Sequence, residues 1–239
     1  MISFEILLIL GSLGFYLYGS SMLLYINEAV FIKGRRSWYF SYPETNWSFL
    51  GRQLYIPNPL TPEAPIFRLY WTVSNQQKIN REESLESLLT TIIPLQYLMM
   101  ILLMFFFIWL PTVLFLYGSG PQLLWMFGII YLNISVILVF IYRNKKILGI
   151  SNKKYIALVF ESLACAPFSL NILRKITLSR PPNKDPIELA SDLLEHEAFK
   201  KFLGIVIKRI DEQLELMDID NPRYASLESY KNKIHRRRR

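Results

Sequence analysis

A few side chains in this sequence are of the kind that carry out acid, base or metal chemistry, but their spacing matches no known reaction. The stretch HEAFK at 196–200 begins like a zinc-protease helix, yet Lys200 stands where the second histidine is required. Cys165 is the single cysteine, so a monomer can build neither a disulfide nor a thiolate metal site. We therefore expect no cofactor and no metal, and the pattern favours a non-enzymatic protein.

Glu161 is the ionisable group to consider first, because it interrupts an otherwise uncharged stretch. An ionisable group at membrane depth is a functional hypothesis, and Lys154 and Lys175 share its helical face. Gln96 and Asn133 are the amides within the most apolar segments. We expect these two to hydrogen-bond between helices rather than to line a pathway.

The composition indicates a membrane protein. Hydrophobic residues make up 52% of the 239 residues and charged residues only 19%, which is too apolar for an ordinary soluble domain. The net charge of +8 is typical of a membrane protein with basic cytoplasmic loops, and we expect no nucleic-acid partner.

The first predicted transmembrane helix occupies residues 1–27. No charged residue lies between Glu5 and Glu28, and no Lys or Arg precedes the apolar run, which favours a retained anchor over a cleaved signal peptide. Three glycines give this helix small surfaces for helix contact, or simply reflect how common glycine is in membranes: Gly11, Gly14 and Gly19.

Residues 87–142 are free of charge and too long for one helix. The sequence YGSGPQ at 117–122 predicts a tight turn, so this stretch reads as a helical hairpin with spans at about 92–116 and 123–142. Basic residues follow the first span (KGRR, 33–36) and the third (RNKK, 143–146). This bias predicts a multi-pass cell-membrane protein with its N-terminus outside and its C-terminus in the cytoplasm.

Residues 143–178 form a basic linker followed by a one-sided helix at 155–173. Ile156, Phe160 and Leu163 fall on the face opposite Glu161, and Pro167 predicts a break. We interpret the segment as interfacial or re-entrant on the cytoplasmic side, with a fourth span as the alternative.

Residues 28–86 form an aromatic- and proline-rich loop that we expect to pack on the bilayer surface, with a partner surface as the alternative. The stretch IFRLYWTV at 66–73 predicts a short strand within it.

Residues 179–239 predict a cytoplasmic helical tail. Its apolar face must be buried on a partner, on the loop or on the membrane, and its residues are Phe199, Leu203, Val206, Ile210, Leu214 and Met217. Basic side chains here and upstream are candidates for binding lipid headgroups or a partner, the terminal ones for anionic lipid: Arg35, Arg36, Lys145, Lys146, Arg174, Lys175, Arg236, Arg237, Arg238 and Arg239.

The predicted fold is an all-α integral membrane protein with three transmembrane helices, a cytoplasmic interfacial or re-entrant helix, and a soluble amphipathic tail. The predicted function is that of a scaffold or accessory subunit that docks protein partners, or a second copy of itself, through the loop and tail. Two alternatives stay open. One is a small transporter or channel subunit with a polar pathway around Glu161, and the other is a membrane-embedded lipid enzyme that uses Glu161 and His196.

Overall fold

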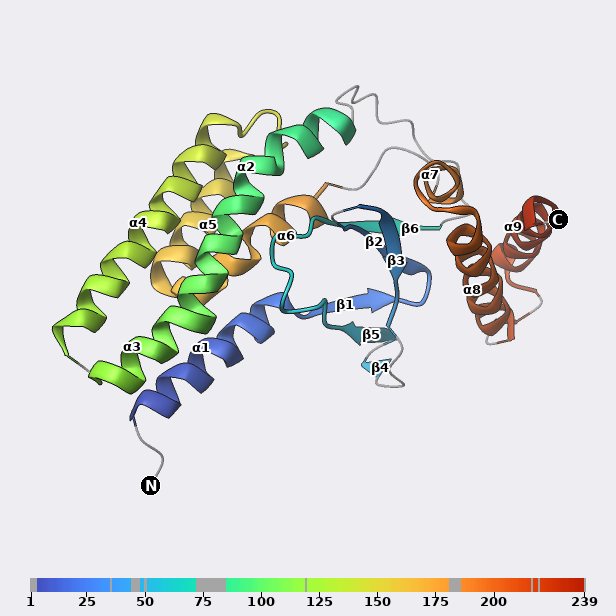
Figure 1. The fold of residues 1–239 in the computed structure, drawn as a ribbon. Helices are drawn as coiled ribbons and strands as arrows, with labels where there is room; N and C mark the ends of the chain where they lie inside the picture. Colours follow the sequence, from blue (N-terminus) through green and yellow to red (C-terminus); the bar gives the residue numbers. More distant parts are fainter. Residues whose placement is uncertain are drawn as a thin grey trace. The chain divides into compact units, whose positions relative to one another are not determined.

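The computed structural model describes residues 4–34, 36–43, 48–49, 51–71, 85–118, 120–180, 186–215, 217–218 and 220–238. The fold is mostly helical and divides into two compact units, each assembled from segments that are separated in sequence (Figure 1). Unit 1 comprises Met1–Ser21, Ile56–Pro65 and Glu82–Arg180, and unit 2 comprises Met22–Tyr55, Ile66–Arg81 and Pro181–Arg239. The loop predicted at residues 28–86 therefore contributes to both units.

Among its described residues, unit 1 contains two helices that are long and apolar enough to cross a membrane. One runs through Leu85–Tyr117 as α2 (Leu85–Met104), a π-helical turn η1 (Phe105–Trp109) and α3 (Leu110–Tyr117). The other is α4 (Pro121–Arg143), which packs against α2 and α3 (Figure 1). The predicted break between them is confirmed, since Gly118 has a φ of 61° and the next helix begins at Pro121.

The π-helical turn has an identifiable cause in the sequence. Pro111 has no N–H to donate to the carbonyl of Phe107, and its ring crowds that turn. A wider π-turn directly before the proline keeps the helix continuous.

The first helix is shorter than predicted. Helix α1 (Phe4–Ser20) ends at Ser20, and the chain enters strand β1 at Met22, so the prediction of one helix through Asn27 is wrong. The Ser20 hydroxyl lies 2.8 Å from both the Tyr16 carbonyl and Asn171 Oδ1, and Asn171 Nδ2 donates to the Tyr16 carbonyl at 3.1 Å. A tertiary contact thus fixes this end of the helix.

Residues 152–178 form a helical hairpin. Helix α5 (Asn152–Ala164) runs back along α4, a 3-10 segment η2 (Ala166–Asn171) reverses the chain, and α6 (Ile172–Leu178) returns. The break predicted from Pro167 is confirmed, because Cys165 is extended with φ −144° and ψ 95°.

Two tyrosines fix the depth of α5 along α4. Tyr155 donates to the Leu138 carbonyl at 3.4 Å, and Tyr131 donates to the Leu163 carbonyl at 3.2 Å. At the other end, Arg180 donates to the Ile147 carbonyl in the turn that follows α4. The hairpin therefore returns to the level at which it started.

Unit 2 contains two antiparallel three-stranded sheets, so the all-α prediction is corrected. Strand order is β1–β5–β4 in one sheet and β3–β2–β6 in the other. The strands are β1 (Met22–Tyr25), β2 (Glu28–Lys33), β3 (Trp38–Ser41), β4 (Ser48–Phe49), β5 (Arg52–Tyr55) and β6 (Ile66–Tyr70). The strand predicted at 66–73 corresponds to β6.

Some aromatic residues of the loop lie in a protein core, whereas Tyr39 and Tyr70 are exposed, and packing on a bilayer surface stays a prediction. Phe31 and Phe67 are buried, and Phe202 of α8 packs edge-on against Phe31 at 5.4 Å and Phe40 at 5.2 Å between ring centroids. Unit 2 is completed by three helices, which are α7 (Pro186–Leu193), α8 (His196–Glu215) and α9 (Pro222–Arg238).

The apolar face predicted for the tail is covered by the chain itself. Leu203, Val206 and Ile210 of α8 are fully buried, while Phe199, Leu214 and Met217 are half-buried. Among the three surfaces considered from the sequence, the chain's own loop is the one that α8 contacts, through Phe202, and α9 packs on α8 as well.

Of the three glycines in α1, Gly19 is the one packed closely against other side chains, and its substitution tests this packing. A Cβ at Gly19 would lie 2.9 Å from Phe168 Cδ1 and 3.0 Å from Asn171 Nδ2, whereas a Cβ at Gly11 meets nothing within 4 Å. We expect Gly19→Val to lower the free energy of unfolding by about 1–3 kcal/mol through overpacking. Gly11→Val carries the same change in helix propensity and is the control. Equal thermal stability of the two variants in detergent would contradict this packing.

Candidate functional site

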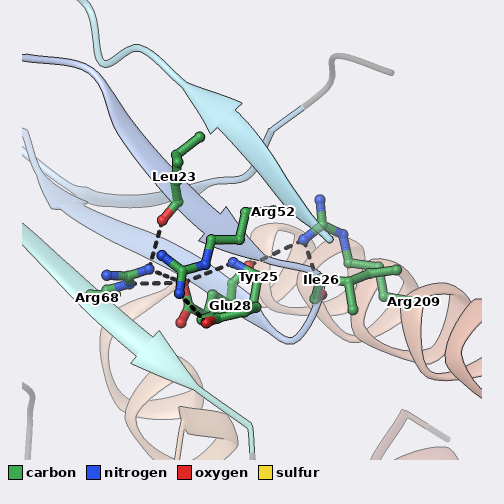
Figure 2. Close-up of polar contacts among 7 residues, drawn as sticks. All are labelled: Leu23, Tyr25, Ile26, Glu28, Arg52, Arg68 and Arg209. Carbon is green, nitrogen blue, oxygen red and sulfur yellow. Dashed lines mark hydrogen bonds and ion pairs between the residues drawn. The ribbon is translucent and has the colours of Figure 1, made fainter. Parts of the chain in front are cut away.

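Unit 2 contains a fully buried carboxylate, Glu28, at the start of β2. Its Oε2 accepts from the Tyr25 backbone N–H at 3.0 Å and from Arg68 Nε at 2.8 Å, and Arg68 Nη2 completes the ion pair (Figure 2). Arg68 Nη2 also donates to the Leu23 carbonyl at 2.8 Å. This arginine therefore joins β6 to β2 of its own sheet and to β1 of the other.

Two exposed tyrosines and two arginines surround Glu28, and we name this set the Tyr–Arg patch. The Arg52 guanidinium carbon lies 4.4 Å from the centroid of the Tyr25 ring, and Arg52 Nη2 donates to the Tyr25 hydroxyl. The Arg68 guanidinium carbon lies 5.4 Å from the Tyr70 ring centroid. The sheet register causes the first pairing, because Tyr25 is opposite Arg52, whereas Arg68 and Tyr70 are two residues apart on the same face of β6.

The Tyr–Arg patch combines rigid aromatic area with charge. Tyr25 is 40% exposed and Tyr70 is 39% exposed. Burial of its hydroxyl raises the pKa of Tyr70, and the Glu28 carboxylate raises it further, while Arg68 opposes this shift. Tyr70 is therefore a neutral hydrogen-bond donor at physiological pH, beside the Arg68 cation. Tyrosine and arginine are the residues most enriched at energetically dominant positions of protein interfaces.

Arg209 of α8 holds the elements beneath this patch. Its guanidinium donates to the backbone carbonyls of Ile26, Glu28 and Pro43 at 3.1–3.2 Å and to Gln53 Oε1 at 3.3 Å (Figure 2 shows the Ile26 contact). Burial lowers the pKa of Arg209, an effect that Glu212 and Tyr42 oppose. Because arginine still keeps its charge at physiological pH, these carbonyls have a permanent donor.

The sequence predicts that Arg174 binds lipid headgroups or a partner at the surface. In the structure Arg174 is instead buried within unit 1. The residue is 2% exposed, and Nη2 donates to the carbonyls of Asn58 at 2.6 Å and Thr61 at 2.7 Å. Gln96 likewise contacts the 56–65 segment, because its Nε2 donates to the Glu63 carbonyl at 3.0 Å rather than to another helix. Both polar groups are used to hold this segment on the helices.

Glu161 forms an ion pair with Lys175 across the α5–α6 hairpin, so one of its two predicted partners is the one observed. The pair lines a groove of about 150 Å³ in unit 1. The lining residues are Ile150, Lys154, Ala157, Leu158, Glu161, Lys175, Ile176 and Ser179.

The remaining predicted site residues lie apart from one another. Asn133 is half-buried in α4, and among the described residues its Oδ1 has no hydrogen-bond partner, in contrast to the predicted helix–helix bond. Lys145 Nζ donates to Asn152 Oδ1 at 3.1 Å. Arg36, Lys146 and Arg236 are exposed. Arg35, Arg239 and the side chains of Arg237 and Arg238 lie outside the described part of the chain.

No catalytic grouping emerges from these positions. Within the part of the chain that the structure describes, no three His, Cys, Asp or Glu side chains gather where they could hold a metal ion. His196 is an exposed residue at the first position of α8.

Sequence reasoning did not identify the Tyr–Arg patch. The alternation in IFRLY at 66–70 places Arg68 and Tyr70 on one face of a strand. Nothing local, however, indicates that Tyr25 and Arg52 are cross-strand neighbours, because that pairing depends on the sheet register.

Replacing Arg209 tests its role as the buried donor of unit 2. We expect Arg209→Met to lower the free energy of unfolding by about 2–5 kcal/mol, because it leaves buried acceptors without their donor. Lys208→Met removes the same charge from the neighbouring position, where the side chain is 78% exposed, and should change stability little. Thermal unfolding of the full-length protein measures both, and equal effects would refute the assignment.

Comparison with known proteins gives no family for this chain. No protein-family model matches it, and neither a curated protein nor a solved structure shows significant similarity.

Proposed function

We propose that this chain is a non-enzymatic integral membrane protein, a scaffold or accessory subunit that docks a protein partner on its cytoplasmic unit 2. Unit 1 is the membrane anchor in this proposal, and the Tyr–Arg patch is the docking surface. The observation that carries the proposal is the apolar outer surface of the two long helices of unit 1.

That outer surface is of the kind that lipid solvates. Only 33% of the most apolar window of each long helix is buried, whereas the core helix of a soluble protein is mostly buried. Large apolar side chains face outward along both helices, among them Ile101, Ile108, Phe115, Leu124, Leu132, Val136 and Val139. At 1.5 Å per residue, the 23 residues of α4 span about 34 Å, enough for the hydrocarbon layer.

Three hydroxyls on these helices are satisfied by their own helix. Thr112 and Ser135 are exposed and Thr91 is half-buried, and each donates to the carbonyl four residues earlier, at 2.7–2.8 Å. Groups that face hydrocarbon must find such internal partners. This pattern supports a lipid environment.

The hairpin geometry supports a re-entrant segment and a cytoplasmic C-terminus. Tyr131, which contacts the end of α5, is twelve residues from Arg143, or about 18 Å along α4. If α4 spans the bilayer, α5 reaches roughly its middle, and α6 returns to the side on which it started. Arg143, Lys145 and Lys146 mark that side as cytoplasmic under the positive-inside rule.

The composition of the Tyr–Arg patch supports docking. Its arginines are already ordered by Glu28 and the tyrosine rings, so a partner binds with little further loss of side-chain freedom. The basic residues of α9, such as Lys233 and Arg236, are exposed and suit anionic lipid beside the docked partner.

Single-cysteine labelling tests the membrane topology. In a Cys165→Ser background, we expect a membrane-impermeant maleimide to label Gln122→Cys in intact cells, because this position lies in the external turn. Lys146→Cys and Arg236→Cys should react only after permeabilisation. Labelling of Arg236→Cys in intact cells would refute the proposed orientation.

Cross-linking in native membranes tests the docking surface. We expect the wild-type protein to form a discrete cross-linked complex with a partner or with a second copy. Tyr25→Ala/Arg52→Ala should reduce its yield at least about tenfold, as expected when residues dominating an interface are truncated. The control Tyr39→Ala/Arg36→Ala removes an equally exposed tyrosine and an exposed arginine of the same unit. Equal yields from the two double variants would count against the patch.

One observation favours a second function, that of a small transporter or channel subunit. The Glu161–Lys175 pair lies on the hairpin, and Asn133 Oδ1 is a buried acceptor on the adjacent helix α4. Solute or ion flux into reconstituted vesicles that is unchanged by Glu161→Gln would dismiss this alternative.

A further inference from the structure

We propose that the groove between α5 and α6 is a binding site for the headgroup of an anionic glycerophospholipid. The inference rests on the membrane placement proposed above, but it concerns a different surface from the docking patch. The groove combines a polar wall, from Lys154, Glu161, Lys175 and Ser179, with an apolar floor from Ile150, Leu158 and Ile176.

The charges of the lining select the ligand. Two lysines against one glutamate leave a net charge of +1. Glu161 engages Lys175, whereas Lys154 is exposed and forms no ion pair in the part of the chain described here. A phosphodiester with a charge of −1 neutralises the lining and gives Lys154 a partner. The Ser179 hydroxyl remains as a donor or acceptor for the hydroxyls of a glycerol headgroup.

The size of the groove excludes a whole lipid but fits a headgroup. Its volume of about 150 Å³ is below the usual range for drug-sized ligands. The acyl chains must therefore lie outside. Ala157 is an exposed lining residue, and Phe160, 72% exposed, follows it by three positions and so lies on the neighbouring surface of α5. An apolar surface at the mouth of the groove favours an amphiphile over free phosphate.

The hairpin places the polar wall at a suitable depth. Lys154 is in the first turn of α5, at the level of the turn after α4, whereas Glu161 is two helical turns further along. Lys154 is thus close to the phosphate layer in the proposed topology, and Glu161 is beneath it. A lipid bound there has its phosphate between Lys154 and Lys175 and its headgroup alcohol toward Ser179, at the cytoplasmic end of the groove, while its acyl chains run past Phe160 toward the centre of the bilayer.

Native mass spectrometry of the full-length protein in mild detergent, titrated with phosphatidylglycerol, tests this site. Lys154→Ala should weaken the binding of the first phosphatidylglycerol about tenfold, the equivalent of one charge-assisted hydrogen bond. Lys153→Ala removes the same charge from an exposed neighbour that does not line the groove, and should leave binding unchanged. Glu161→Gln should strengthen binding, because the net charge of the lining rises from +1 to +2.

Three results would overturn the inference. The first is equal weakening by Lys153→Ala and Lys154→Ala, which would mean general electrostatic attraction. The second is phosphatidylcholine binding as tightly as phosphatidylglycerol. The third is displacement of the lipid by millimolar inorganic phosphate, which would make free phosphate the ligand. The maleimide labelling described above tests the membrane topology independently of lipid binding, so the two proposals can fail separately.

Discussion

Both units depend on the same interaction, a buried guanidinium that binds several backbone carbonyls. Arg174 binds the 56–65 segment in unit 1, and Arg209 binds the ends of strands and turns in unit 2. Irregular backbone away from water must find hydrogen-bond partners, and an arginine provides up to five donors from one side chain. Each irregular segment can therefore be buried without joining a helix or a sheet. Lysine cannot replace arginine here, since it lacks the planar fork.

Polar groups find their hydrogen-bond partners in different ways in the two units. In the long helices of unit 1, hydroxyls such as Thr112 and Ser135 bind their own helix, so nothing outside the helix is needed. In unit 2, Arg68 pairs with Glu28 Oε2 within a sheet that also has an apolar core. Breaking one partner of such a buried pair is strongly destabilising. The exposed tyrosines over Arg52 and Arg68 therefore stand on a rigid base.

The sequence predicts the parts of this fold that depend on local pattern. The long apolar helices, the turn at Gly118 and the break at Pro167 follow from hydropathy, glycine and proline. The end of α1 at Ser20 could not be predicted, because a contact with Asn171, 151 residues away, determines it. Likewise, an apolar face on α8 is visible in the sequence, but the strands that cover it are short and are separated by segments that contain prolines.

Some residues of the candidate sites can be predicted from the local sequence, and others cannot because they depend on tertiary contacts. Glu161 is evident as a lone charge among apolar residues, and helical geometry limits its partner to Lys154 or Lys175. Arg174 has the same appearance in the sequence as any surface arginine, and only the path of the 56–65 segment explains its burial. The Tyr–Arg patch depends on cross-strand register, which short strands do not encode by hydrophobic alternation.

The interleaving of the two units has a consequence for synthesis. The strands of unit 2 are complete by residue 70, but the helix that covers Phe31 and Phe40 begins only at His196. Translation of the intervening residues, 71 to 195, at roughly 5–20 residues per second takes about 6–25 s. During that interval the aromatic side of the sheet is outside the ribosome without its cover, while the apolar helices are still being made. A nascent chain of this design needs a chaperone to shield those rings until α8 has been made.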